Sequence, residues 1–337
     1  MIWTKFSTKR LVRSLAALGI VAGTTIAVGS SSASAASTIV SGEAFLQGTF
    51  VEVGIAANGR AGSGNAAPAG FHPRSSGNRL GFRVDRGEDG WGVGVDDGDF
   101  FVPGAPFEGW GIQVGSTSYF NNDVDTQIPG SLSNLSTSGG SQAVTWSGTT
   151  SGIQVNQVYS VATSKSALNI DITYTNTSGA TISDLYYFRG VDPDNNQTIN
   201  GSYTTTQEIR SASGPAMVQA TQPDGSFLLL NSLDSRAKVA YGATSSWLRS
   251  GFTIANLHSG AAADNIYTAG TATTSRQRHL PDGQRWLTGT WGLHHVPCQL
   301  SPRRGVCGPE HRRDRPGNAL TRNNRQCLAH RLERRSR

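Results

Sequence analysis

The stretch Ala167-Leu-Asn-Ile-Asp-Ile-Thr-Tyr-Thr-Asn176 decides the fold class. Every second residue from Leu168 to Tyr174 is apolar, and the residues between them are Asn, Asp and Thr. A period of two is typical of an antiparallel strand that has one face on the core and the other in water. We therefore expect a half-buried strand over these ten residues.

Similar strand-like segments extend in both directions from this stretch, with Gly, Asn, Asp and Ser at the breaks. Segments 153–161 and 181–191 flank it, and Ser178-Gly179 supplies a turn. Further strands are expected at Thr49–Ala56, Leu80–Val84, Gly109–Val114, Ala143–Trp146, Ala216–Ala220, Phe227–Leu230 and Ala237–Tyr241. Many short strands without a convincing amphipathic helix predict an all-β fold, a large antiparallel β-sandwich.

The N-terminus has the three-part layout of a secretory signal. Four basic residues between Lys5 and Arg13 precede an apolar run, Leu15 to Val28, and small residues follow up to Ala35. A membrane span needs about 20 apolar residues, so the shorter run favours a signal cleaved after Ala35. We therefore expect residues 1–35 to be a signal peptide and the mature chain to be secreted, with no transmembrane segment after cleavage.

Charge divides the chain into an acidic body and a basic tail. Residues 36–275 carry 11 basic and 19 acidic residues, whereas 276–337 carry 14 arginines and four acids. Nucleic-acid binding needs basic surface to neutralise phosphates, so we do not expect it of the body. All three cysteines lie in the tail, so the body can form no disulfide; about 240 residues can bury an adequate core without one.

Three interpretations of the tail remain open. It is a genuine basic segment for anionic wall polymers or nucleic acid, a metal site at His294, His295 and the cysteines, or the product of a frameshift. The cysteine spacing fits no usual zinc pattern. A one-base forward shift from Arg276 removes the Arg, His and Cys excess together. We expect 276–337 to be out of frame and disordered, which would cost the sandwich its last strands and leave an open sheet edge.

Several motifs give the body a resemblance to a known group. They are Phe45 to Gly54, Ala69 to Arg74, Leu80 to Asp85, Gly98 to Gly104 and Tyr186 to Asn195. With these the body resembles a poorly characterised group of exported bacterial surface and secreted proteins. The Leu168 to Asn195 stretch is also similar, by pattern alone, to the galactose-mutarotase-like supersandwich. The second resemblance implies a supersandwich-like fold; neither supplies an activity.

One polar loop offers a candidate metal site. Asp192, Asp194 and Asn196 follow a predicted strand with a spacing that can bring several oxygens around one calcium ion. Gln197 and Tyr203 stand where an EF-hand loop needs Gly and Glu. An Asx-turn preset by Pro193 and direct contact with a sugar are the alternatives.

Acids and indoles close in sequence suggest a ligand surface. Asp97 and Asp99 lie between Trp91 and Trp110. Carboxylates can bind the hydroxyls of a sugar through hydrogen bonds, and an indole ring can cover its apolar face. Asp-Gly pairs such as Asp97-Gly98 are first of all turn formers. We add to these candidate ligand residues two others, His72 and Arg189. A structural hydrogen bond is the other interpretation of His72.

The body lacks the usual nucleophile signatures, since it has no cysteine and no Gly-x-Ser-x-Gly elbow. We therefore expect a secreted or surface-associated binding module whose partner is a glycan or another cell-surface component, with calcium as a candidate cofactor. Two alternatives remain. One is a carbohydrate-active enzyme of mutarotase-like or lyase-like type, and the other is a structural module of the envelope.

Overall fold

The computed structural model describes residues 37–88, 91, 98–101, 108–193, 197, 199, 201–242, 253–260, 265–270, 272–275, 289–296 and 306–307. They belong to one compact unit, Ala35–Arg337. The predicted signal peptide lies outside the described residues, as does most of the predicted tail. None of the helices described in these ranges has both the length and the hydropathy of a membrane span.

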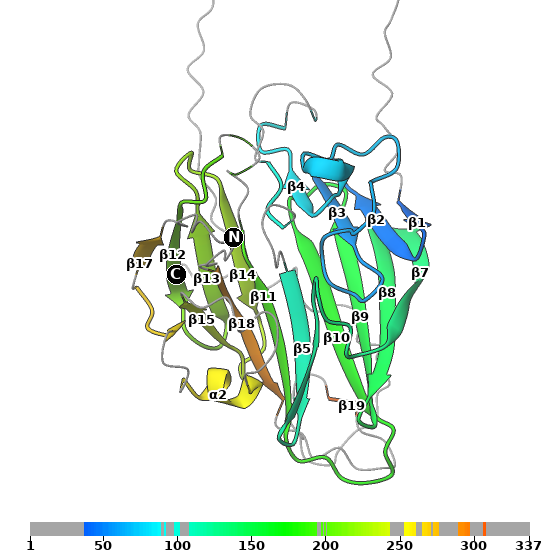
Figure 1. Cartoon of the computed structure of the whole chain (residues 1–337), viewed down its shortest axis with the longest axis vertical. Helices are drawn as coiled ribbons and strands as arrows, with labels where there is room; N and C mark the ends of the chain where they lie inside the picture. The colour runs from blue at the N-terminus through cyan, green and yellow to red at the C-terminus, as the bar shows by residue number, and fades with distance from the viewer. Residues whose placement is uncertain are drawn as a thin grey trace, which may run out of the picture. The chain divides into compact units, whose positions relative to one another are not determined.

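The fold is all-β and antiparallel, as predicted (Figure 1). The N-terminal sheet contains β1 (Thr38–Val40), β2 (Glu43–Gln47), β3 (Val51–Ile55) and β4 (Phe82–Val84). The five-stranded sheet has the order β19 (Val306–Cys307), β10 (Leu168–Asn176), β9 (Ile153–Ala162), β8 (Ser141–Thr150) and β7 (Gly130–Ser138).

Two further sheets complete the described part. The six-stranded sheet has the order β16 (Asn265–Ile266), β15 (Lys238–Gly242), β18 (Gly289–Val296), β11 (Leu185–Val191), β5 (Glu108–Val114) and β6 (Thr117–Asn121). The fourth sheet has the order β14 (Phe227–Ser232), β13 (Ala216–Thr221), β12 (Thr205–Ser211) and β17 (Ala272–Ser275). The described helical segments include a 3-10 turn, Ser76–Asn78, and the short helix α2 (Ile254–Ser259).

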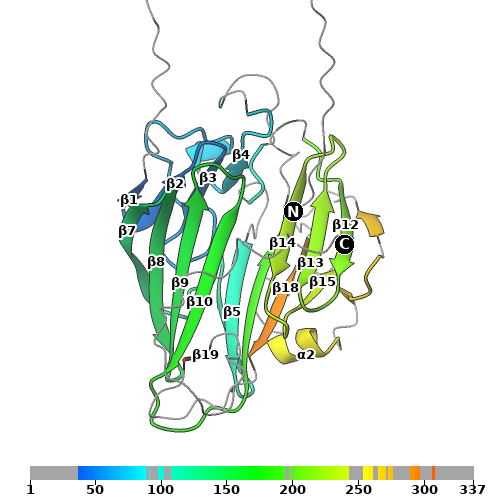
Figure 2. The same cartoon turned by 180° about the vertical axis from the view of Figure 1, so that it is seen from behind.

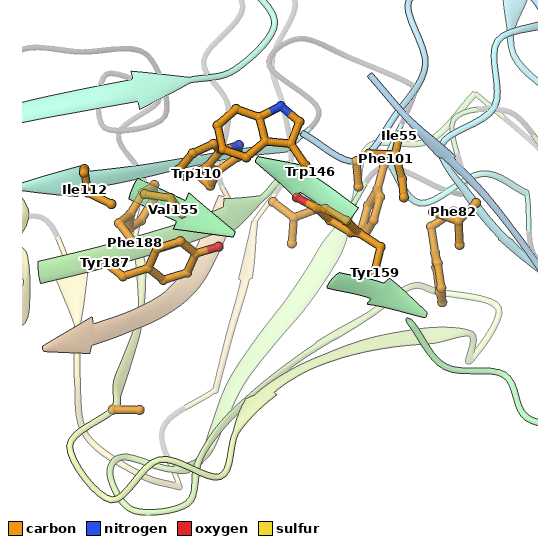
Figure 3. Close-up of a cluster of buried hydrophobic side chains, with 14 of the residues drawn as sticks. Ile55, Phe82, Phe101, Trp110, Ile112, Trp146, Val155, Tyr159, Tyr187 and Phe188 are labelled. Atoms are coloured by element: carbon orange, nitrogen blue, oxygen red, sulfur yellow. The ribbon is translucent and has the colours of Figure 1, made fainter. Parts of the chain in front are cut away.

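The five-stranded and six-stranded sheets face each other across an aromatic core (Figure 3). Trp110 of β5 meets Trp146 of β8 edge-on, with ring centroids 4.9 Å apart. Tyr187 of β11 lies 6.2 Å from Trp110 and 6.1 Å from Tyr174 of β10. Because these rings come from both sheets and are almost fully buried, they hold the two layers of the sandwich together.

The remaining sheets pack on this sandwich. The N-terminal sheet contacts the five-stranded sheet, through β1 on β7 and β2 on β8 and β9. The fourth sheet contacts β15 and β18, and α2 contacts β5, β11 and β18. Seen from behind, β7 to β10 run in chain order beneath β1 to β4 (Figure 2).

The alternating stretch that opened the sequence analysis forms β10. Its apolar side chains pack against the core, whereas Asn169 and Asp171 are exposed. β10 pairs with β9 over its whole length, from Leu168 opposite Val161 to Asn176 opposite Ile153. This strand is thus confirmed in place and in orientation.

Two described strands, β18 and β19, lie in the predicted tail. β18 pairs with β11 on one side and with β15 on the other. β19 pairs with β10 at Tyr174 and Thr175. Whether 276–337 is read in the correct frame is a question about the gene, and the frameshift stays a prediction.

Candidate functional site

The first candidate site is the surface formed by His72 and Trp91, called here the His72–Trp91 surface. The two rings are stacked, with centroids 5.4 Å apart and planes 6° from parallel. The His72 side chain is 38% exposed, and Trp91 is half-buried. The Arg83 guanidinium carbon lies 5.5 Å from the Trp91 ring centroid. Two predicted ligand residues are therefore in direct contact, with a cation beside them.

A buried carboxylate fixes the position of His72. Glu52 is fully buried on β3, where its Cα partner across the ladder is Arg83 of β4. Its Oε1 lies 2.8 Å from His72 Nδ1, and its Oε2 accepts a 2.8 Å hydrogen bond from the His72 backbone N–H. Gln47 Nε2 donates to Oε1 at 2.6 Å. Arg83 donates to the His72 carbonyl. Hydrogen bonds therefore fix the ring, the backbone N–H and the carbonyl of His72.

These contacts also decide which ring nitrogen of His72 is available. A carboxylate only accepts hydrogen bonds, so Nδ1 carries the proton that Glu52 accepts. Among the described residues, Nε2 of His72 has no hydrogen-bond partner. The surface thus offers apolar ring area together with a polar ring nitrogen held in a fixed position, and the same geometry is that of a general base.

Trp110, another predicted ligand residue, lies in the core. Its side chain is 1% exposed, and its indole N–H donates to the Asn58 carbonyl at 3.2 Å. β6 and β11 pair with β5 on either side, and Trp146 covers the ring. In the described fold Trp110 therefore joins the sheets and does not meet solvent.

Asp99, also a predicted ligand residue, is fully buried. Its carboxylate accepts hydrogen bonds from three backbone N–H groups: Gly81 at 2.7 Å, Phe82 at 3.1 Å and Phe101 at 2.9 Å. Hydrogen bonds to a charged acceptor are the strong ones, so Asp99 fixes the segment 99–101 against β4.

Arg189 of β11 is buried in a polar network between the sheets. Its Nε lies 2.9 Å from Oε1 of Glu108, and its Nη2 donates to the Gly59 carbonyl at 3.1 Å and to the Tyr159 hydroxyl at 3.0 Å. Glu108 Oε2 accepts a 2.6 Å hydrogen bond from the Ala61 N–H. Within the described residues, Nη1 of Arg189 has no hydrogen-bond partner.

Burial dominates the titration of this network. It raises the pKa of Glu108, and the Arg189 guanidinium, the Ala61 amide and Arg60 offset only part of the rise. Burial also raises the pKa of Tyr159 well above its ordinary value, although Arg189 acts in the opposite direction. Tyr159 therefore stays a neutral hydroxyl, which donates a hydrogen bond to the Gly59 carbonyl.

Of the three predicted calcium ligands, Asp192 belongs to the described residues. Asp192 is buried, at 1% exposure, directly after β11. Asp194 and Asn196, like the predicted ligand residue Asp97, lie outside the described residues. The part of the chain that the structure describes holds no group of three His, Cys, Asp or Glu side chains placed to bind a metal. Calcium therefore stays a prediction.

No spacing in the sequence indicates that Glu52 supports His72 or that Glu108 supports Arg189. Glu52 is 20 residues from His72 and 31 from Arg83, and no local pattern joins them. The signal that could have found Glu52 is its place in Val-Glu-Val-Gly, where a charged residue lies within an apolar strand. A charge buried in a strand needs a partner.

Comparison with known proteins adds no family to this geometry. No protein-family model matches the sequence, and no curated protein matches it.

Proposed function

We propose that the mature chain is a secreted or surface-associated binding module, and that the His72–Trp91 surface binds a glycan. The observation that carries the proposal is the stacked pair of rings, partly exposed and held by buried Glu52. The signal-like N-terminus supports an extracellular place for this activity.

The chemistry of the surface suits a sugar. The aromatic rings give apolar area to the C–H face of a pyranose, and His72 and the indole N–H of Trp91 can hydrogen-bond its hydroxyls. Trp91 makes no indole hydrogen bond to the described residues. Because Glu52 and Arg83 already hold His72, little conformational entropy is lost when a ligand binds.

Isothermal titration calorimetry of the purified full chain with chitotetraose, cellotetraose and maltotetraose tests the proposal. We expect saturable binding of at least one of them, and W91A to weaken it by about tenfold or more. Tyr186 and His258 form the other described aromatic–histidine contact, with centroids 5.7 Å apart. Y186A is therefore the matched control and should bind as the wild type does.

Two results would overturn the glycan proposal. One is a complete lack of saturable binding across the three oligosaccharides, which would favour a structural module of the envelope. The other is equal weakening by W91A and Y186A, which would show that the variants act through stability. Thermal melting of each variant separates this second result from loss of the surface itself.

One observation favours an enzyme as the second candidate. The Glu52–His72 pair leaves Nε2 of His72 free of hydrogen bonds within the described residues, as a general base requires. A carbohydrate-active enzyme of mutarotase-like or lyase-like type would convert one of the oligosaccharides or its reducing-end sugar. If polarimetry or product analysis detects conversion that H72N abolishes, catalysis replaces simple binding at this surface.

A further inference from the structure

A cavity of about 540 Å³ lies between segments that are far apart in the sequence. Segments 166–170 and 227–231 each line it with five successive residues. Phe82, Phe100 and Phe101 add three aromatic rings. A space of this size is far larger than a packing defect and lies within the range of binding sites.

Both segments meet the cavity with the edge of a strand. Successive side chains of a strand point to opposite faces, so a face contributes every second residue, whereas an edge can contribute each residue in turn. One edge of β10 is covered by β9 and one edge of β14 by β13. The described lining includes no residue of β9 or β13. The cavity therefore lies against the other edge of each strand.

These two edges have no neighbouring strand at the cavity. β14 pairs with β13 alone among the described strands, and β19 meets β10 only at Tyr174 and Thr175. Outside the ladders with β9 and β13, segments 166–170 and 227–231 make no hydrogen bond to the described residues. The outward N–H and C=O groups of such an edge are a template on which another strand can pair.

The edge of β14 lacks the features that usually prevent pairing. Natural edge strands carry charge, proline or a bulge for this purpose. β14 has no charged residue and no proline, and its ladder with β13 is regular along its length. Its Phe227 and Leu229, both in the lining, are 56% and 38% exposed. Exposed apolar residues beside unpaired backbone groups favour an extended peptide as the occupant.

The charged residues of the described lining already have partners. Arg189 lies 2.9 Å from Glu108. Arg86 lies 3.8 Å from Asp224 and makes a further interaction as well. Since the described lining offers no uncompensated charge of either sign, an uncharged occupant fits it best.

We propose that this cavity binds an extended segment of another protein by strand addition, with the segment pairing along the free edge of β14. Such a segment is uncharged and has an apolar residue at every second position, so one of its faces packs on the phenylalanines of the cavity. A second copy of this chain fits less well, because its β14 would bring β13 with it into a space bounded by two edges. The described lining contains neither ring of the His72–Trp91 surface, and neither proposal depends on the other.

The test measures binding of the peptide acetyl-Val-Thr-Val-Thr-Val-amide to the full chain by isothermal titration calorimetry. Two analogues are N-methylated, one at peptide residues 2 and 4 and the other at residues 3 and 5. Successive N–H groups of a strand point to opposite edges, so each analogue lacks donors along one edge. We expect saturable binding of the parent peptide and a loss of about tenfold or more in at least one analogue.

Variants and hydrogen exchange locate the site. L229K places a charge at the edge of β14 and should weaken binding of the parent peptide by about fivefold or more. Leu233 is 60% exposed and outside the described lining, so L233K is the matched control and should bind as the wild type does. The peptide should slow hydrogen exchange of the amides in 227–231. W91A should leave peptide binding intact.

Several outcomes would overturn the inference. A lack of saturable binding would do so, as would equal affinity for the parent peptide and both analogues, which would show that apolar contact alone holds it. Equal effects of L229K and L233K would place the peptide elsewhere. If L229K fails to fold, the two analogues still decide the matter. A dimer in sedimentation that L229K makes monomeric would assign the edge to a second copy of the chain instead.

Discussion

Glu108 and Arg189 pair diagonally across the β5–β11 ladder. The Cα partner of Glu108 is Val191 and that of Arg189 is Trp110, yet Arg189 Nε lies 2.9 Å from Glu108 Oε1. Residues two apart on neighbouring strands share a face of the sheet, so the register itself brings the charges together. The pair is almost fully buried between the sheets, where an unpaired charge would be costly.

The pH dependence of stability tests the charge state of Glu108. Burial raises its pKa in the folded chain. Its contribution to the free energy of unfolding is therefore fully present below the unfolded pKa, about 4.3, and is lost as pH rises through the folded value. We expect the free energy of unfolding of the wild type minus that of E108Q to fall as pH rises above about 4.3, by about 1.4 kcal/mol for each pH unit that separates the folded pKa from the unfolded one. Urea denaturation measures it; a difference that grows with pH would contradict the prediction.

Gly59 is a position where substitution should be costly. Its φ is +79°, and an added Cβ would lie 2.9 Å from Cγ of Trp146. Gly70 has a φ of +94° but nothing within 4 Å of its added Cβ. We expect G70A to lower the free energy of unfolding by about 1–2 kcal/mol through backbone strain alone. G59A should cost about 1–3 kcal/mol more, because it also overpacks the core. Equal losses in urea denaturation would show that Trp146 moves aside freely.

The calcium site predicted at Asp192, Asp194 and Asn196 has a simple thermal consequence. A cation that binds the folded chain alone raises its melting temperature, so EDTA should lower the Tm and added CaCl₂ should restore it. D192N should remove this response. The measurement is differential scanning fluorimetry of the wild type and D192N, with MgCl₂ as the control salt. An unchanged Tm in EDTA would leave the Asx-turn as the explanation of this loop.

The frameshift interpretation concerns the mass of the secreted product. We expect the intact mass of the protein secreted from its native gene to differ from that of residues 36–337, because the Arg, His and Cys excess after 275 is what an out-of-register segment would give. Mass spectrometry of culture supernatant provides the value, and an N-terminal peptide map checks cleavage after Ala35 independently. A mass that matches 36–337 would make the tail genuine and direct attention to wall-polymer binding.

The fold class could be predicted from the sequence because strand periodicity is local. The alternation from Leu168 to Tyr174 requires only that one face be buried, and β10 meets that requirement. The helix α2 was missed because six residues do not complete two turns, so no helical period can show. The pairing of β18 with β11 joins segments about 100 residues apart, and no local pattern indicates it.

The candidate site was less predictable, since exposure depends on what packs against a strand. Trp91 and Trp110 look alike in sequence, each beside glycines and close to acids. Only the long-range packing of β8 on β5 separates the buried indole of Trp110 from the half-buried one of Trp91. His72 could be proposed as a ligand residue, but it lies in a loop and its partner Glu52 lies on β3, and no spacing in the sequence indicates their pairing.

The place of β18 has a consequence for the order in which the protein can be assembled. A chain is synthesised from its N-terminus, so β11 and β15 emerge well before residues 289–296. Until that last segment arrives, each of them has an open edge where β18 will later pair. The six-stranded sheet is therefore completed only after residues 289–296 have emerged. A chain interrupted before residue 289 would lack β18, so β11 and β15 would keep open edges in the middle of the sheet.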